Sequence, residues 1–192
     1  MKILALDTAT ENCSAALLVD GQLTAREQLL ARGHAANILG MIDEVLAEAG
    51  ASLAGLTAIA FGRGPGAFTG VRLAASVTQG LAHGGGVPVV PGTDLAAPVA
   101  DERVSEPGHV TVPADWASGP DLRGAGTGFA AYPQLRSTLS ARLGSIRDVH
   151  PRAAEIALLA VPEVIAGRLH SPEEALPVYL RDDVVHPGAG SH

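Results

Sequence analysis

Hydrophobic and polar positions form short strand-like runs at the beginning of the chain. Residues 2–6 are a brief apolar run that ends at Asp7, which predicts a buried strand. Two further strand-like runs flank Asp20-Gly21, a residue pair typical of tight hairpin turns. We therefore expect a meander of three antiparallel strands that begins at the N-terminus.

Two helices with a strand between them are expected next. Residues 35–49 carry apolar side chains at helical spacing and stop at Gly50, and residues 70–83 are apolar or small on nearly every side. Residues 57–61 form the intervening strand. The first helix is apolar over a wider arc than one face requires, and the second has only a narrow polar stripe. Periodicity leaves open whether the second helix is buried inside the domain or lies in a protein–protein interface.

The pattern weakens in the second half of the chain. Residues 98–128 are rich in proline, glycine and charge. Further elements are expected at 109–112 (a short strand), 129–143 (helix), 145–149 (strand or loop) and 153–166 (helix). Pro162 should kink or shorten the last helix. The tail, 186–192, is expected to be disordered.

Composition and charge narrow the class of protein. The 192 residues are 47% hydrophobic but only 3% aromatic, which indicates a globular protein with an aliphatic and alanine core. The net charge of −7 disfavours direct binding of nucleic acid by this chain alone, since phosphate contacts need clustered Lys and Arg. Cys13 is the single cysteine, which excludes an intrachain disulfide and a multi-cysteine zinc site. Without a visible signal peptide or membrane-spanning run, we expect a cytoplasmic protein and no membrane partner.

A glycine-rich stretch, FGRGPGAFTGV at 61–71, joins the strand to the second helix. Many nucleotide-binding proteins hold phosphate at such a turn. This stretch has no lysine, however, and Pro65 removes one of the backbone donors. We therefore interpret it as a structural loop, with these residues: Gly64, Pro65, Gly66, Phe68, Thr69 and Gly70.

The candidate chemistry lies at the end of the first strand. Asp7 could hold a hydrated Mg²⁺, with Thr8 and Thr10 beside it for phosphate oxygens. A strand-end aspartate also simply caps a turn, and spacing alone does not separate the two. His34 begins the first helix, but Ile38 stands where a metal-binding helix would place its second histidine. No catalytic residue and no metal site is therefore predicted.

Three stretches together resemble the TsaB (YeaZ) family of tRNA threonylcarbamoyladenosine biosynthesis proteins: ILALDTAT, RGHAANILGMIDEVLAEAG and FGRGPGAFTGVRLAASVTQGLA. The resemblance implies an α/β protein with an actin-like ATPase fold made of two ribonuclease-H-like lobes. It assigns 1–97 to a complete first lobe and 98–185 to the second.

The resemblance also implies a non-catalytic role. In the family, a catalytic TsaD subunit modifies adenosine 37 of tRNAs that read codons beginning with A, the TsaB subunit pairs with it through two helices, and the ATPase TsaE joins them. The same helices would form a homodimer when the chain is alone. No cofactor is expected on this chain, although ATP or ADP could sit at the complex interface. Carried onto this sequence, the partner interface comprises His34, Ala35, Ile38, Leu39, Met41, Ile42, Val45, Val71, Arg72, Ala74, Ala75 and Thr78.

The second lobe departs from the family pattern. Members open this lobe with a strand pair carrying a motif like I-D-A-R-[MR]-x-E-V-Y, and nothing of this kind stands between Ala97 and Val110. We therefore expect an incomplete second sheet with exposed edges and low stability. Two alternative functions for the fold are an actin-like ATPase or small-metabolite kinase, and a metallopeptidase. The first needs a phosphate loop in the second lobe and an adenosine-binding glycine pair, and neither is clear in this sequence. The second needs a histidine pair, which is missing.

Overall fold

The computed structural model describes residues 1–92, 105–112, 122–139 and 143–179. The chain divides into two compact units. Unit 1 consists of Met1–Pro98 and His150–Val178, and unit 2 of Val99–Val149 and Tyr179–His192.

This division corrects the boundary expected from the sequence. The first lobe was expected to end at 97 and everything from 98 to 185 to belong to the second. Residues 150–178 instead return to unit 1, because the last helix packs on the sheet of that unit. The predicted tail, 186–192, lies outside the described residues.

Unit 1 is built on a five-stranded sheet with the strand order β3-β2-β1-β4-β5. Its strands are β1 (Lys2–Asp7), β2 (Asn12–Val19), β3 (Gln22–Leu29), β4 (Ala58–Gly62) and β5 (Val89–Gly92). The first three are antiparallel, as the meander prediction required, and β4 and β5 run parallel to β1. Asp20 and Gly21 both have positive φ, 48° and 89°, the backbone that a two-residue hairpin turn needs.

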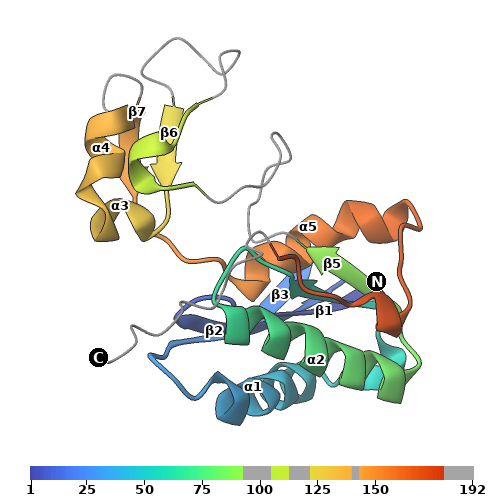
Figure 1. Cartoon of the computed structure of the whole chain (residues 1–192). Coiled ribbons are helices and arrows are strands. Elements are labelled where there is room, and N and C mark those ends of the chain that lie inside the picture. Colours follow the sequence, from blue (N-terminus) through green and yellow to red (C-terminus); the bar gives the residue numbers. More distant parts are fainter. Residues whose placement is uncertain (93–104, 113–121, 140–142, 180–192) are drawn as a thin grey trace, which may run out of the picture. The chain divides into compact units, whose positions relative to one another are not determined.

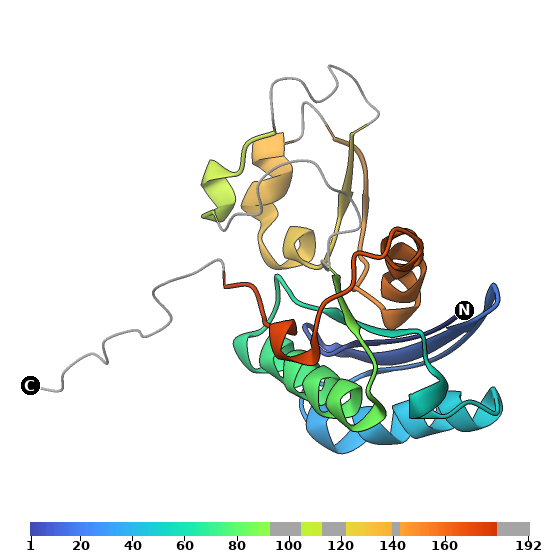
Figure 2. The same ribbon diagram turned by 90° about the vertical axis from the view of Figure 1, so that its right-hand side faces the viewer.

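Helices cover both faces of this sheet (Figures 1 and 2). The helices α1 (His34–Glu48) and α2 (Phe68–Gly85) lie side by side on one face, and α5 (Ala153–Ile165) lies on the other. Strand β1 shows why both layers form, since it is apolar at every position before Asp7 except the first. Leu4 and Leu6 face the α1–α2 layer, and Ile3 and Ala5 face α5.

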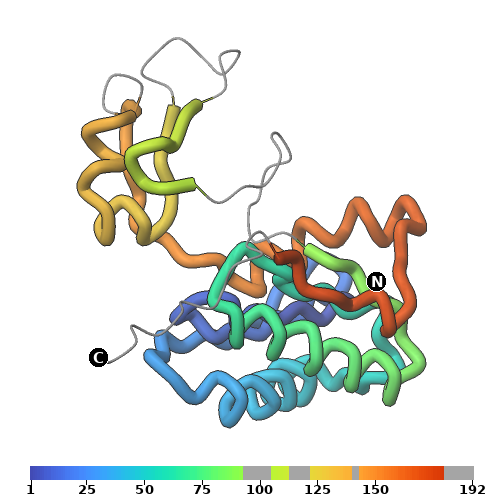
Figure 3. The backbone as a smooth tube through the Cα atoms, in the orientation of Figure 1, coloured from blue at the N-terminus to red at the C-terminus, as the bar shows by residue number. Residues whose placement is uncertain are grey.

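The segment after α5 runs back past the start of β5 and along α2 (Figure 3). His170 and Val89 exchange two backbone hydrogen bonds, of 2.9 and 3.0 Å. Gln79 on α2 donates to the carbonyl of Ala175 at 3.1 Å. Pro162 does not stop α5, which continues to Ile165. In the C-terminal segment, both the helix α5 and the extended stretch after it therefore contact unit 1.

The described part of unit 2 is small. Its elements are the strands β6 (Leu122–Ala125) and β7 (Leu143–Arg147) and the helices α3 (Gly128–Ala131) and α4 (Pro133–Leu139). The two strands pair in parallel. Two predictions were wrong here: 109–112 is not a strand, and 129–143 is not one helix, because Pro133 starts a new helix and Leu143 already begins β7. Strands β5 and β6 were not predicted.

Candidate functional site

The turn after β1 brings together the three residues that were predicted as cofactor candidates. The Ala9 amide donates to Asp7 Oδ1 at 2.7 Å, and the Asn12 amide donates to Thr10 Oγ1 at 3.2 Å. Thr8 Oγ1 donates to the carbonyl of Gly70, at the start of α2, at 2.7 Å. Each candidate side chain is thus engaged by the protein itself. Their role toward a cofactor stays a prediction.

Asp7 is completely buried at the end of β1. Burial raises the pKa of its carboxyl group to about 6, although the amides of Ala9 and Thr8 and the nearby His34 oppose the shift. Its second oxygen, Oδ2, has no hydrogen-bond partner among the described residues. Asp7 therefore combines a turn-capping role with a carboxyl group that ionises at a higher pH than an exposed aspartate does.

The backbone of the glycine-rich loop, residues 64–70, lies in close contact with the backbone of the turn at residues 8–10. The Ala67 amide donates to the Ala9 carbonyl at 2.7 Å. A Cβ at Gly66 would stand 2.5 Å from the Ala9 carbonyl oxygen, and a Cβ at Gly70 would stand 2.1 Å from that of Thr8. Both glycines are thus required by close approach of two backbones. This contact gives a physical reason for a structural loop at this position.

His34 is the first residue of α1 and is half-buried. Its Nε2 lies 2.8 Å from the Thr10 carbonyl oxygen. Among the residues that the structure describes, no three His, Cys, Asp or Glu side chains gather as metal ligands would. The histidine contacts the same turn as the loop before α2, a connection that the sequence pattern did not reveal.

The expected partner interface needs correction, because most of its residues belong to the core of this chain. Eight of the twelve are buried beneath α1 and α2: Ile38, Met41, Ile42, Val45, Val71, Ala74, Ala75 and Thr78. The periodicity identified the apolar arc of each helix correctly, but the sheet of unit 1 takes up most of that arc. The surface of α1 and α2 that a partner could contact is therefore smaller than the twelve predicted residues would give.

The solvent side of the two helices retains an apolar strip. Leu39 on α1 is 50% exposed and Ala35 is exposed one turn earlier. Phe68, predicted only as a loop residue, begins α2 and is 42% exposed. The guanidinium carbon of Arg72 lies 3.4 Å from the centroid of the Phe68 ring. Their i, i+4 spacing within a helix was the signal that could have identified this pair.

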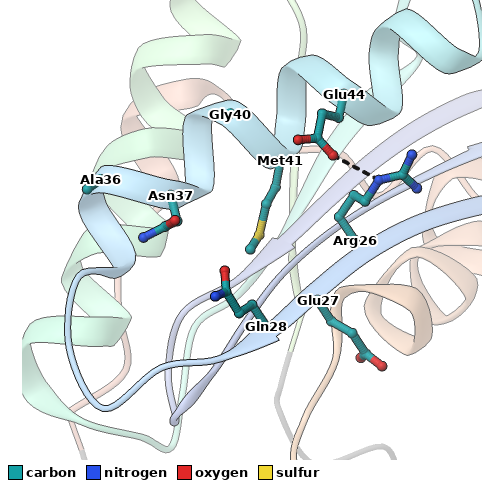
Figure 4. Close-up of a pocket in the computed structure, with 8 residues that line it drawn as sticks. All are labelled: Arg26, Glu27, Gln28, Ala36, Asn37, Gly40, Met41 and Glu44. Atoms are coloured by element: carbon teal, nitrogen blue, oxygen red, sulfur yellow. Dashed lines mark hydrogen bonds and ion pairs between the residues drawn. The ribbon is translucent and has the colours of Figure 1, made fainter.

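A groove of about 350 Å³ separates α1 from the edge strand β3 (Figure 4). Arg26 on the strand crosses it and donates to Glu44 on the helix at 2.9 Å, and it also contacts Glu48 at 2.5 Å. The other residues that line the groove are Glu27, Gln28, Ala36, Asn37, Gly40 and Met41. The ion pairs fix the outer side of α1 to the edge of the sheet.

None of the described helices is both long and apolar enough to cross a membrane.

Comparison with known proteins places this arrangement in a family. Residues 27–115 match the family model for TsaD, tRNA N6-adenosine threonylcarbamoyltransferase. The tRNA threonylcarbamoyladenosine biosynthesis protein TsaB of Haemophilus influenzae is 53% identical over 97 residues, which cover 50% of this chain and 41% of that protein. The Escherichia coli protein of the same name is 33% identical, with 96% of each chain covered. That alignment spans 225 positions, so it opens gaps opposite this 192-residue chain.

Two solved structures share the fold. YeaZ from Pseudomonas aeruginosa has a TM-score of 0.85 at 35% identity, covering 93% of this chain and 99% of that one. A protein described as having similarity to peptidase YEAZ, from the same organism, has a TM-score of 0.84 at 35% identity, over 94% and 99%. The expected actin-like, ribonuclease-H-like α/β fold is thus confirmed. Since one third of its residues match the E. coli protein over nearly the whole of both chains, the chain belongs to the TsaB family.

Proposed function

We propose that this protein is a subunit of the machinery that forms N6-threonylcarbamoyladenosine at position 37 of tRNAs reading codons that begin with A. The observation that carries the proposal is the near full-length similarity to the E. coli biosynthesis protein TsaB. The protein acts in the cytoplasm and contacts tRNA through its partners, since its own charge is −7.

The partner in this proposal is a TsaD-type catalytic subunit. The segment 27–115, which includes α1 and α2, is the part of the chain that resembles the TsaD family. Two chains that each present a similar pair of helices can pack them in a nearly two-fold arrangement, as identical subunits do. The same reasoning favours a homodimer through these helices when the catalytic subunit is absent.

The contact surface proposed is the apolar strip of Ala35, Leu39 and Phe68, with Arg72 at its side. Exposed leucine and aromatic side chains contribute most when a partner buries them, and arginine is common in such contacts. The carboxylates of Glu44 and Glu48 are not part of this strip, since both form ion pairs with Arg26 on β3. An interface on these helices would therefore be apolar at its centre.

The role proposed for this chain within the complex is non-catalytic. Thr8, Thr10 and His34, which chemistry at the strand end would need, are bonded to the backbone or to neighbouring amides. In our proposal the chain supports the catalytic subunit and helps to recruit a TsaE-type ATPase, and a nucleotide could sit at the interface of the complex.

Two experiments test the proposal. Calorimetric titration of the chain with the TsaD-type subunit encoded in the same genome should give a saturable association. Reconstituted threonylcarbamoyladenosine synthesis should depend on adding the chain. No association at micromolar concentration, together with synthesis that is unchanged when the chain is omitted, would refute the proposal. Saturable heat from ATP and Mg²⁺ titrated into the chain alone would instead favour the ATPase alternative.

A further inference from the structure

Polar contacts of His34 join the start of α1 to neighbouring elements, since Cys13 Sγ lies 4.0 Å from the His34 carbonyl oxygen and the His34 ring contacts the turn after β1. Gly33 precedes the helix with a φ of 95°, and no side chain caps the first turn. The side-chain amide of Asn37 (Nδ2) donates to the Gly33 carbonyl at 2.8 Å, but that bond stays within the helix and its cap residue. His34 Nε2, in contrast, lies 2.8 Å from the carbonyl oxygen of Thr10. Because a carbonyl oxygen can only accept a hydrogen bond, His34 Nε2 must carry the hydrogen atom and donate the hydrogen bond to the turn after β1.

The same turn also holds the start of α2. One residue before Thr10, the Ala9 carbonyl accepts the amide of Ala67, and Thr8 donates to the Gly70 carbonyl, both at 2.7 Å. The two backbones lie so close together that even a methyl group at Gly70 would overlap the Thr8 carbonyl oxygen. A turn of three residues, 8–10, is thus bonded to the first residue of one helix and to the first turn of the other.

We infer that His34 is a positioning residue which, by bonding to this turn, fixes the start of α1 relative to the start of α2 and so sets the spacing of the partner surface. The inference rests on the proposed function, because the exposed residues of the proposed surface lie within the first two turns of each helix. A surface made of Leu39 on one helix and Phe68 on the other complements a partner only if the two keep their separation.

The test compares variants of one side chain. His34→Ala removes the donor, and His34→Gln restores an N–H group of similar reach. We expect His34→Ala to weaken association with the TsaD-type subunit about tenfold or more and His34→Gln to recover most of the loss. Asn37→Ala is the matched control, since it removes a hydrogen bond in the same helical turn that does not reach the turn at 8–10.

Amide hydrogen exchange of the chain alone separates this inference from the proposed function. His34→Ala should speed exchange of the amides of Ala67 and Val71 at the start of α2, whereas Asn37→Ala should affect α1 only. Exchange at the α2 start that is unchanged in His34→Ala would overturn the inference, whether or not the partner binds. If wild-type protein fails to bind while the exchange result holds, only the proposed function fails. Should His34→Ala not fold, His34→Phe, which keeps a ring without an N–H donor, is judged by the same criterion.

Discussion

The two units of this chain differ in how far their sheets are buried. In unit 1 both faces of a five-stranded sheet are covered, and the largest side chains of β1 and β4 are fully buried. In the described part of unit 2, two strands pair, and only Gly124 and Leu139 are buried. A small sheet gains stability only when enough apolar surface is removed from water. We therefore expect most of the stability of this protein to come from unit 1.

The difference also fits the alignment with the E. coli relative, which needs gaps opposite this chain. The family motif expected for a strand pair at the beginning of the second lobe is absent between Ala97 and Val110 of the sequence. Unit 1, which receives α5 back from the C-terminal part of the chain, is built without those residues.

The largest effect is expected at the close contact between the loop and the turn. Gly70→Ala should lower the free energy of unfolding by more than about 3 kcal/mol, because its methyl group would meet the Thr8 carbonyl at 2.1 Å. Gly80→Ala on the same helix is the control, since a Cβ there meets nothing within 4 Å. The control should stabilise the helix by about 1 kcal/mol. Urea unfolding followed by circular dichroism measures both. Equal losses would show that the close contact with the Thr8 carbonyl does not exclude a side chain at Gly70.

Core truncations in the two units should differ. Ile156→Ala on α5 removes a fully packed side chain from the sheet of unit 1 and should cost about 3 kcal/mol. Ile146→Ala on β7 truncates a half-buried side chain and should cost less than about 1 kcal/mol. Both are measured by urea unfolding. A larger loss for Ile146→Ala would show that unit 2 is the more tightly packed part.

Asp7 should make unit 1 sensitive to pH. Burial raises its pKa from 3.8 to about 6, so the folded state binds the proton more tightly than the unfolded state does. The resulting stabilisation is full below about pH 4 and is lost as pH rises through about 6. Relative to Asp7→Asn, wild-type protein should therefore lose about 2 to 3 kcal/mol between pH 3.5 and 7. Parallel pH profiles of the two proteins, from unfolding at each pH, would disprove the shift.

The smallest effect is expected on the surface of unit 1. Glu44→Gln removes one carboxylate from Arg26, which keeps its contact with Glu48. Exposed ion pairs contribute little in water, so the change in unfolding free energy should be within about 0.5 kcal/mol. Thermal unfolding at low and high salt is a sufficient measurement. A loss comparable to that of Ile156→Ala would mean that the outer side of α1 matters more than the core beneath it.

Local signals in the sequence predicted much of unit 1. The Asp20-Gly21 turn, the strands around it and both helices follow from residue spacing, and the structure confirms them. The return of α5 to the first sheet was not predictable, since its partners on β2, such as Ser14, lie far away in the sequence. For the same reason, spacing showed that Ile38 and Leu39 lie on an apolar arc but not which of the two the sheet buries. The bond from His34 to Thr10 is likewise tertiary.

The claim that the solvent side of α1 and α2 binds the catalytic subunit can be tested with two leucines, on helices that cover opposite faces of the same sheet. Leu39 on α1 is 50% exposed and Leu158 on α5 is 52% exposed, so glutamate at either place should leave the fold intact. In calorimetric titrations, Leu39→Glu should lower the affinity for the TsaD-type subunit at least about a hundredfold, and Leu158→Glu should leave that affinity unchanged. Unchanged affinity for Leu39→Glu, or a loss confined to Leu158→Glu, would contradict the claim.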